Sequence, residues 1–211
     1  MSTTPKKTYK LGTFMRSIHL THTFDVLDEF QSLLEFAWSQ SEKRLREEYE
    51  GMTAYGFENE HDMTDFRSFL EDDFHQLGEV KKLGDALAIS ALYRQVETQI
   101  RRVVGSTFPD ANNKKKDKIL LGKAVPEIDC SKLPGFDALN ELRMLNNCIK
   151  HAGSKADAKL ASAYPAWIEN EELADLNKAY ARLKPLAHQY LRAFIDEAYD
   201  RSSAFEASPA K

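Results

Sequence analysis

The amino-acid sequence predicts an all-α protein built as an antiparallel bundle of four to five main helices. Apolar residues recur at spacings of three and four along most of the chain, which is typical of amphipathic helices. No stretch alternates apolar and polar residues as a half-buried strand does, and no glycine-rich phosphate loop is present. With 211 residues, of which 42% are hydrophobic and 29% charged, the chain is long and apolar enough to bury one core.

The pattern divides the chain into three parts. We expect residues 1–20 to be a basic, irregular lead-in and residues 201–211 to be a flexible tail. Between them, residues 21–200 are expected to form a single helical domain. Within that domain we expect an N-terminal helical layer over 21–78 and the main bundle over 79–200.

Four longer helices are expected. The first begins near Thr21 or Thr23 and ends at Gly51, and its second half is so charged that it either faces water or packs against a partner protein. The second runs from Thr64 to Gly78, and the third from Glu79 to Val104. The last is expected over 171–199, where Pro185 should kink or split it. A short helical turn is expected over 156–161, and Trp167 and Ile168 should pack back on the core.

Composition excludes several functional classes. The net charge of −4 is not that of a general nucleic-acid coating protein, so any contact with phosphates must come from a local basic patch. The only two cysteines, Cys130 and Cys148, form no C-x-x-C motif, which argues against a disulfide scaffold or a cysteine zinc site. We expect no metal and no cofactor. The sequence shows no apolar run of membrane-spanning length and no signal peptide, so we expect a cytoplasmic protein.

The helix expected between Gly135 and Gly153 concentrates the residues best suited to chemistry. At about 100° per residue, one side carries the apolar stripe of Ala138, Leu142, Leu145, Ile149 and Ala152. The other side carries Asn140, Arg143, Asn147 and His151 within an arc of roughly 80°. Lys150 and Asn146 border this polar row and are further candidates for binding RNA phosphates.

These residue types suit phosphodiester chemistry without a metal. A histidine can take the proton from a 2′-hydroxyl or return one to the leaving oxygen. An arginine can stabilise phosphate charge, and an asparagine can orient either group. The alternative is that the row is simply the solvated face of a helix, where a terminal histidine is favoured by the dipole.

A basic loop precedes this helix. Lys114, Lys115, Lys116 and Lys118 form the strongest local cationic cluster in the sequence. This loop is either a flexible, solubilising segment or a flap that steers phosphates toward the polar row.

The order of these features resembles the HEPN superfamily of small helical-bundle proteins. The resemblance covers about residues 83–195 and rests on an apolar helix with Tyr93 and Glu97, the basic loop, and the stretch Glu141-Leu-Arg-Met-Leu-Asn-Asn-Cys-Ile-Lys-His-Ala-Gly153. It implies RNA as the substrate, a homodimer, and a site with His151 as acid/base, Arg143 as phosphate clamp and Asn147 as orienter. Tyr93, Glu97 and Asn140 would support this site. Many HEPN proteins are metal-independent endoribonucleases of defence or toxin–antitoxin systems, whereas others are non-catalytic modules that bind a nucleotide, an RNA or a protein.

The sequence departs from the family pattern in the position of its arginine. Family members place four to six residues between Arg and His, whereas seven residues separate Arg143 from His151 here. Asn146 stands where the usual arginine would be. Either Arg143 reaches one turn along the helix to substitute, or the chain is a variant that has lost cleavage and binds an RNA, a nucleotide or a protein partner.

Overall fold

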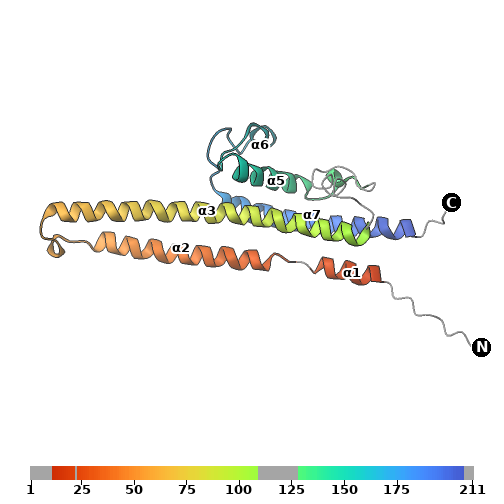
Figure 1. Cartoon of the computed structure of the whole chain (residues 1–211), viewed down its shortest axis with the longest axis horizontal. Helices are drawn as coiled ribbons and strands as arrows, with labels where there is room; N and C mark the ends of the chain where they lie inside the picture. Colours follow the sequence, from red (N-terminus) through yellow and green to blue (C-terminus); the bar gives the residue numbers. More distant parts are fainter. Residues whose placement is uncertain (1–10, 22, 109–127, 207–211) are drawn as a thin grey trace, which may run out of the picture.

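The fold is an all-α bundle with a long helical hairpin extending from it (Figure 1). The computed structural model describes residues 11–21, 23–108 and 128–206. Within these ranges every regular element is a helix, and the only β-type pairing is an isolated bridge between Lys155 and Glu172.

The N-terminal half consists of three helices. Helix α1 spans Leu11–Leu20 and α2 spans Asp25–Gly51. After a 3-10 turn, η1 (Ala54–Gly56), α3 runs back over 48 residues, Glu60–Thr107. Helices α2 and α3 are antiparallel neighbours, and their tip lies far from the other helices (Figure 1).

The C-terminal half covers one end of this hairpin. A second 3-10 turn, η2 (Cys130–Lys132), leads into α5 (Phe136–His151), which is followed by the short α6 (Ala158–Ala163) and the long α7 (Leu176–Glu206). Helix α3 packs on both α5 and α7, and α5 also packs on α7. In Figure 1, α5 lies on the side of α3 opposite to α2, while α7 passes behind α3.

The core therefore lies where α3, α5 and α7 meet. Its fully buried large side chains include Ile89, Leu92 and Ile100 from α3, Leu142 and Leu145 from α5, and Leu183, Tyr190 and Phe194 from α7. Burial of this apolar surface is the main force that holds α5 in place.

Two boundaries expected from the sequence are wrong. Residues 11–20 of the supposed irregular lead-in form α1, which is anchored by Arg16 to Asp196 (2.6 Å) and Asp200 (2.9 Å) of α7. The expected helix end at Gly78 is absent, because α3 continues through it and crosses the expected border between the layer and the bundle. Leu77 beside this glycine is partly buried, and Lys81 one turn on binds Glu35 of α2, so that packing outweighs the poor helix propensity of Gly78.

The last helix also differs from expectation. Helix α7 begins at Leu176 and is not split at Pro185, which lies on its exposed side, where water can satisfy the carbonyl that loses its partner. It continues to Glu206, into the expected flexible tail. Trp167 packs against the core as expected, but Ile168 is exposed.

Among the described residues, no helix is both long enough and apolar enough to cross a membrane.

Candidate functional site

The start of α5 is fixed by a close approach to α7. Gly135 precedes the helix with a φ of +81°, in the left-handed region that glycine favours. A Cβ at this position would lie only 2.3 Å from the carbonyl oxygen of Leu186 in α7. The missing side chain thus lets the first turn of α5 sit directly against the backbone of α7.

The end of α5 is equally well defined. The helix stops at His151, and Gly153 and Ser154 follow with φ values of +59° and +60°. The amide of Ser154 donates to the carbonyl of Cys148 (3.2 Å), which closes the last turn. Lys150 and His151 therefore lie at the negative end of the helix dipole, where positive charge is favoured.

Between these ends the two faces of α5 are arranged as the periodicity predicts. Ala138, Leu142 and Leu145 are buried in the core, and Ile149 and Ala152 pack against its edge. On the opposite side, Asn140 and Arg143 are half-buried, and Asn147, Lys150 and His151 are exposed. We call these last five residues the polar face of α5.

Hydrogen bonds hold Arg143 toward the beginning of the helix. One terminal nitrogen of its guanidinium donates to Oδ1 of Asn140 (2.8 Å), and the amide of Asn140 donates to the hydroxyl of Tyr164 (3.0 Å). That hydroxyl donates to the backbone carbonyl of Asp137 (2.9 Å) or to its carboxylate (3.0 Å). Desolvation by burial raises the pKa of Tyr164 to about 12, so the phenol keeps its proton and the network stays intact at neutral pH.

This network separates Arg143 from His151. Eight residues correspond to about 12 Å along a helix axis, and the bond to Asn140 directs the guanidinium away from the histidine. In this conformation Arg143 does not reach one turn along the helix toward His151. The arginine and the histidine are therefore two separate positions on one face.

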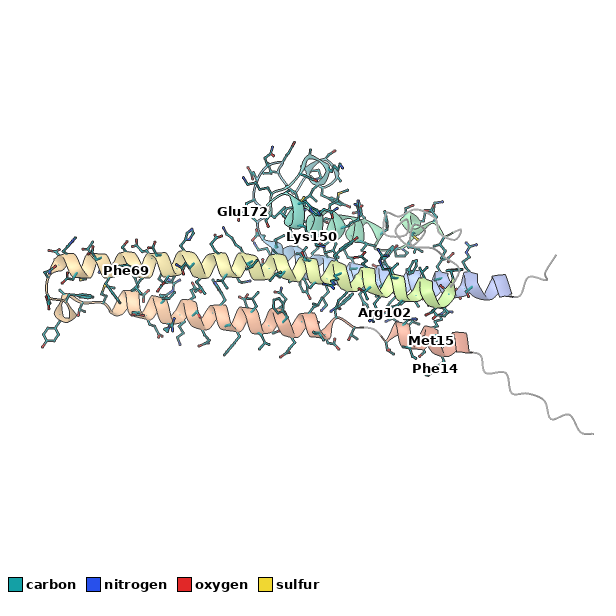
Figure 2. The ribbon with its side chains drawn as sticks, in the orientation of Figure 1. Phe14, Met15, Phe69, Arg102, Lys150 and Glu172 are labelled. Carbon is teal, nitrogen blue, oxygen red and sulfur yellow. The ribbon has the colours of Figure 1, made fainter. Side chains whose placement is uncertain are left out.

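The C-terminal half of the polar face combines cationic and amide side chains. From Arg143 to His151, α5 contains no carboxylate, although the whole chain carries a net charge of −4. Within the described part of the chain, no hydrogen bond or ion pair engages the side chains of Asn147, Lys150 or His151. Figure 2 shows Lys150 near the end of α5, over the seam between α5 and α3 in that view.

Asn146 faces the interior. It stands where the HEPN pattern described above has its arginine. Its side chain is 2% exposed, and its Oδ1 has no hydrogen-bond partner among the described residues. An asparagine in this position cannot contact a phosphate in solvent, so the expectation that Asn146 binds phosphate is wrong.

One buried ion pair behind the polar face was not predicted from the sequence. Glu141 is almost fully buried and accepts two hydrogen bonds from Arg182 of α7 (2.7 and 2.8 Å) and one from the indole of Trp167 (2.8 Å). The sequence signal for this pair is a carboxylate at the border of the apolar stripe, since a buried carboxylate needs partners. The pair joins α5 to α7 and fixes the rotation of the polar face.

Other residues expected at the site have different places. Tyr93 belongs to the core, and Glu97 accepts a hydrogen bond from Arg101 one turn further along α3 (3.0 Å). Lys114, Lys115, Lys116 and Lys118 lie outside the described residues.

The described residues contain no cluster of three histidine, cysteine or carboxylate side chains that would hold a metal ion.

Comparisons with protein-family models, with curated proteins and with solved structures found no match.

Proposed function

We propose that this chain is a HEPN-like RNA-directed protein that binds RNA along the polar face of α5. Arg143 and Lys150 contact phosphates, while Asn147 and His151 contact 2′-hydroxyls and base edges. The observation that carries this proposal is the run from Arg143 to His151, which presents cationic and amide groups without a single carboxylate.

Binding by this face follows from local electrostatics. Lysine and arginine gain affinity by releasing counterions from the phosphate backbone, and this depends on where the charges lie and not on the net charge of the protein. The exposed amide of Asn147 and the imidazole of His151 can bond to the 2′-hydroxyls that distinguish RNA from DNA.

The first prediction concerns affinity for RNA. In titrations of a fluorescent single-stranded RNA followed by anisotropy, Lys150→Ala and Arg143→Ala each raise Kd several-fold and each lower the salt slope by about 0.7. Lys159→Ala, which removes an exposed lysine from α6, is the matched control and leaves Kd unchanged. Equal losses in all three variants, or affinity that does not depend on salt, would contradict binding at this face.

Metal-independent RNA cleavage is the second candidate. It is favoured by the unengaged imidazole of His151, which has Asn147 one turn before it on the same face. In such a reaction the histidine would take the proton of a 2′-hydroxyl, whose oxygen attacks the adjacent phosphate and expels the 5′-oxygen, and the 5′-oxygen takes a proton from water to leave as a hydroxyl. We place it second because the bond between Arg143 and Asn140 keeps the cation away from His151.

Incubation of RNA with the protein in EDTA separates the two candidates. Binding without turnover is expected from the first. Fragments ending in 2′,3′-cyclic phosphate, formed by the wild type and absent with His151→Ala at unchanged RNA affinity, would establish the second.

A further inference from the structure

The helical hairpin carries apolar side chains that nothing in the described chain covers. On α2 they are Val26, Phe30, Leu33 and Ala37, at spacings of four, three and four residues. On α3 they are Val80, Leu83 and Leu87, at spacings of three and four. Apart from Ala37, whose side chain is a single methyl, their exposed fractions lie between 39% and 76%. Such spacings form one continuous stripe on each helix.

Both stripes lie on the same face of the hairpin, the one opposite α7. On α2, Leu34 faces α3. Asp28 lies about a third of a turn to one side and binds Lys184 of α7, and the stripe lies to the other side. On α3, Lys81 pairs with Glu35 of α2. Ile89 and Val96 lie on one side of α3, in the core. Leu83 and Leu87 lie on the opposite side of the helix, away from the core. In Figure 1, where α7 passes behind α3, this face is turned toward the reader.

The two stripes are also at the same level along the hairpin. Leu34 lies against Gly84, and Glu35 reaches Lys81 at 3.1 Å, so Leu33 and Phe30 lie beside Leu83 and Leu87. The seven side chains thus form a single patch, which we call the hairpin patch. If a fully exposed side chain has a surface of ~150–200 Å², the hairpin patch leaves roughly 600 Å² of apolar surface in water. This area is at the upper end of what monomeric proteins expose as one patch.

We propose that the hairpin patch is covered by the hairpin patch of a second copy of this chain, related by a two-fold axis that runs along the hairpin. This operation lays each α2 over α3 of the other copy, so that every helix has antiparallel neighbours in a four-helix bundle. The apolar stripes fit this geometry, because the two-fold axis places the stripe of each α2 against the stripe of α3 in the other copy, at the same level along the hairpin. With a polar rim added, the buried surface approaches the ~800 Å² per partner of a stable interface.

Charge at the rim of the patch supports the second copy. Arg44 of α2 and Asp73 of α3 are both exposed, and within the described part of the chain neither makes a hydrogen bond or an ion pair. Tyr49 donates to Glu71 at 3.3 Å, which puts Arg44 and Asp73 at the same level, and both lie on the face of the hairpin patch. The two-fold axis places each Arg44 over Asp73 of the other copy, giving two ion pairs.

Sedimentation of the full chain tests the interface. Between about 1 and 100 µM, the wild type is expected to shift from one to two times the chain mass of 24.1 kDa. Leu83→Glu raises the dissociation constant of the dimer about 100-fold or more, because the symmetry buries two new charges. Ile168→Glu is the matched control: Ile168 is 60% exposed and Leu83 61%, but Ile168 lies outside the patch, so its variant dimerises like the wild type.

A charge exchange tests the orientation of the two copies. Arg44→Asp and Asp73→Arg each raise the dissociation constant about 5-fold or more, and the double variant restores it. Because all these side chains are exposed in the single chain, circular dichroism should show the same folded monomer throughout. A wild type that stays monomeric at 100 µM, including one that instead captures a different protein, overturns the proposal. So does a dimer that Leu83→Glu leaves intact.

Discussion

At the scale of single residues, the polar face of α5 depends on two residues outside it that contact α7. Gly135 allows the helix to begin against the backbone of α7, and Glu141 binds Arg182 to set its rotation. The periodicity of the sequence predicts which side of α5 is polar. It does not predict that Asn146 and Glu141 are buried, because the width of the buried arc depends on α5 having two neighbours, α3 and α7.

Replacing Gly135 tests how the site is positioned. Gly135→Ala is expected to lower the free energy of unfolding by about 2–4 kcal/mol, because the residue has a positive φ and its methyl group would collide with the carbonyl of Leu186. Urea denaturation measures the change. Gly153→Ala is the control, since its φ is also positive but nothing lies within 4 Å of the added carbon. It should cost only about 1 kcal/mol; equal losses would show that the approach to α7 is unimportant.

His19 makes stability depend on pH. Desolvation by burial, followed by repulsion from Arg102, lowers the pKa of this imidazole below its ordinary value of 6.5. Above pH 6.5, His19 is neutral in both states and its contribution to folding stability is complete. As pH falls below 6.5, the unfolded chain takes up a proton that the folded chain does not, so stability decreases. We expect the wild type to lose more stability than His19→Gln between pH 7.5 and 5.5, as measured by urea denaturation at each pH. Parallel losses would exclude His19 as the cause.

At the scale of helices, the sequence predicts the type of each element better than its ends. Helix α5 and most of α2 lie where apolar spacing, glycine stops and acidic first turns indicate them. The continuous α3 and the early α1 were missed for a physical reason. Gly78 is unfavourable in an isolated helix, and α1 is short, so both depend on tertiary contacts with α2 or α7 that no local pattern encodes.

Two glycines inside α3 should respond to the same substitution in opposite ways. At Gly78 nothing lies within 4 Å of an added carbon, so Gly78→Ala should raise the free energy of unfolding by about 0.5–1 kcal/mol. At Gly84 the added carbon would lie 2.4 Å from a methyl of Leu34, so Gly84→Ala should lower the free energy of unfolding, because Leu34 of α2 has to move away. Thermal unfolding of both variants measures the difference; a gain at Gly84 would show that the two helices are not tightly apposed there.

At the scale of the whole molecule, the hairpin and the polar face of α5 are separate surfaces. Helix α5 lies on the side of α3 away from α2 (Figure 1). Pairing two copies along the hairpin patch therefore puts the two α5 helices on opposite sides of the dimer, where their His151 side chains cannot share a cleft. This arrangement agrees with RNA binding as the leading proposal, because cleavage would have to proceed with one histidine per site.

The all-α architecture was predictable because helical periodicity runs through most of the chain, and the structure confirms it. The turn after Gly51 was also predictable, but the length of the hairpin was not, because the helix end expected at Gly78 does not occur and α3 continues through it. The homodimer and the RNA contact stay predictions, because they concern surfaces and not the packing of the fold.

Ultraviolet crosslinking of the full chain to single-stranded RNA, with the adducts located by mass spectrometry, tests the RNA contact most directly. We expect RNA adducts on residues 143–151, at a lower yield in Lys150→Ala and at an unchanged yield in Lys159→Ala. Adducts confined to other helices, or none at RNA concentrations that saturate binding, would contradict it.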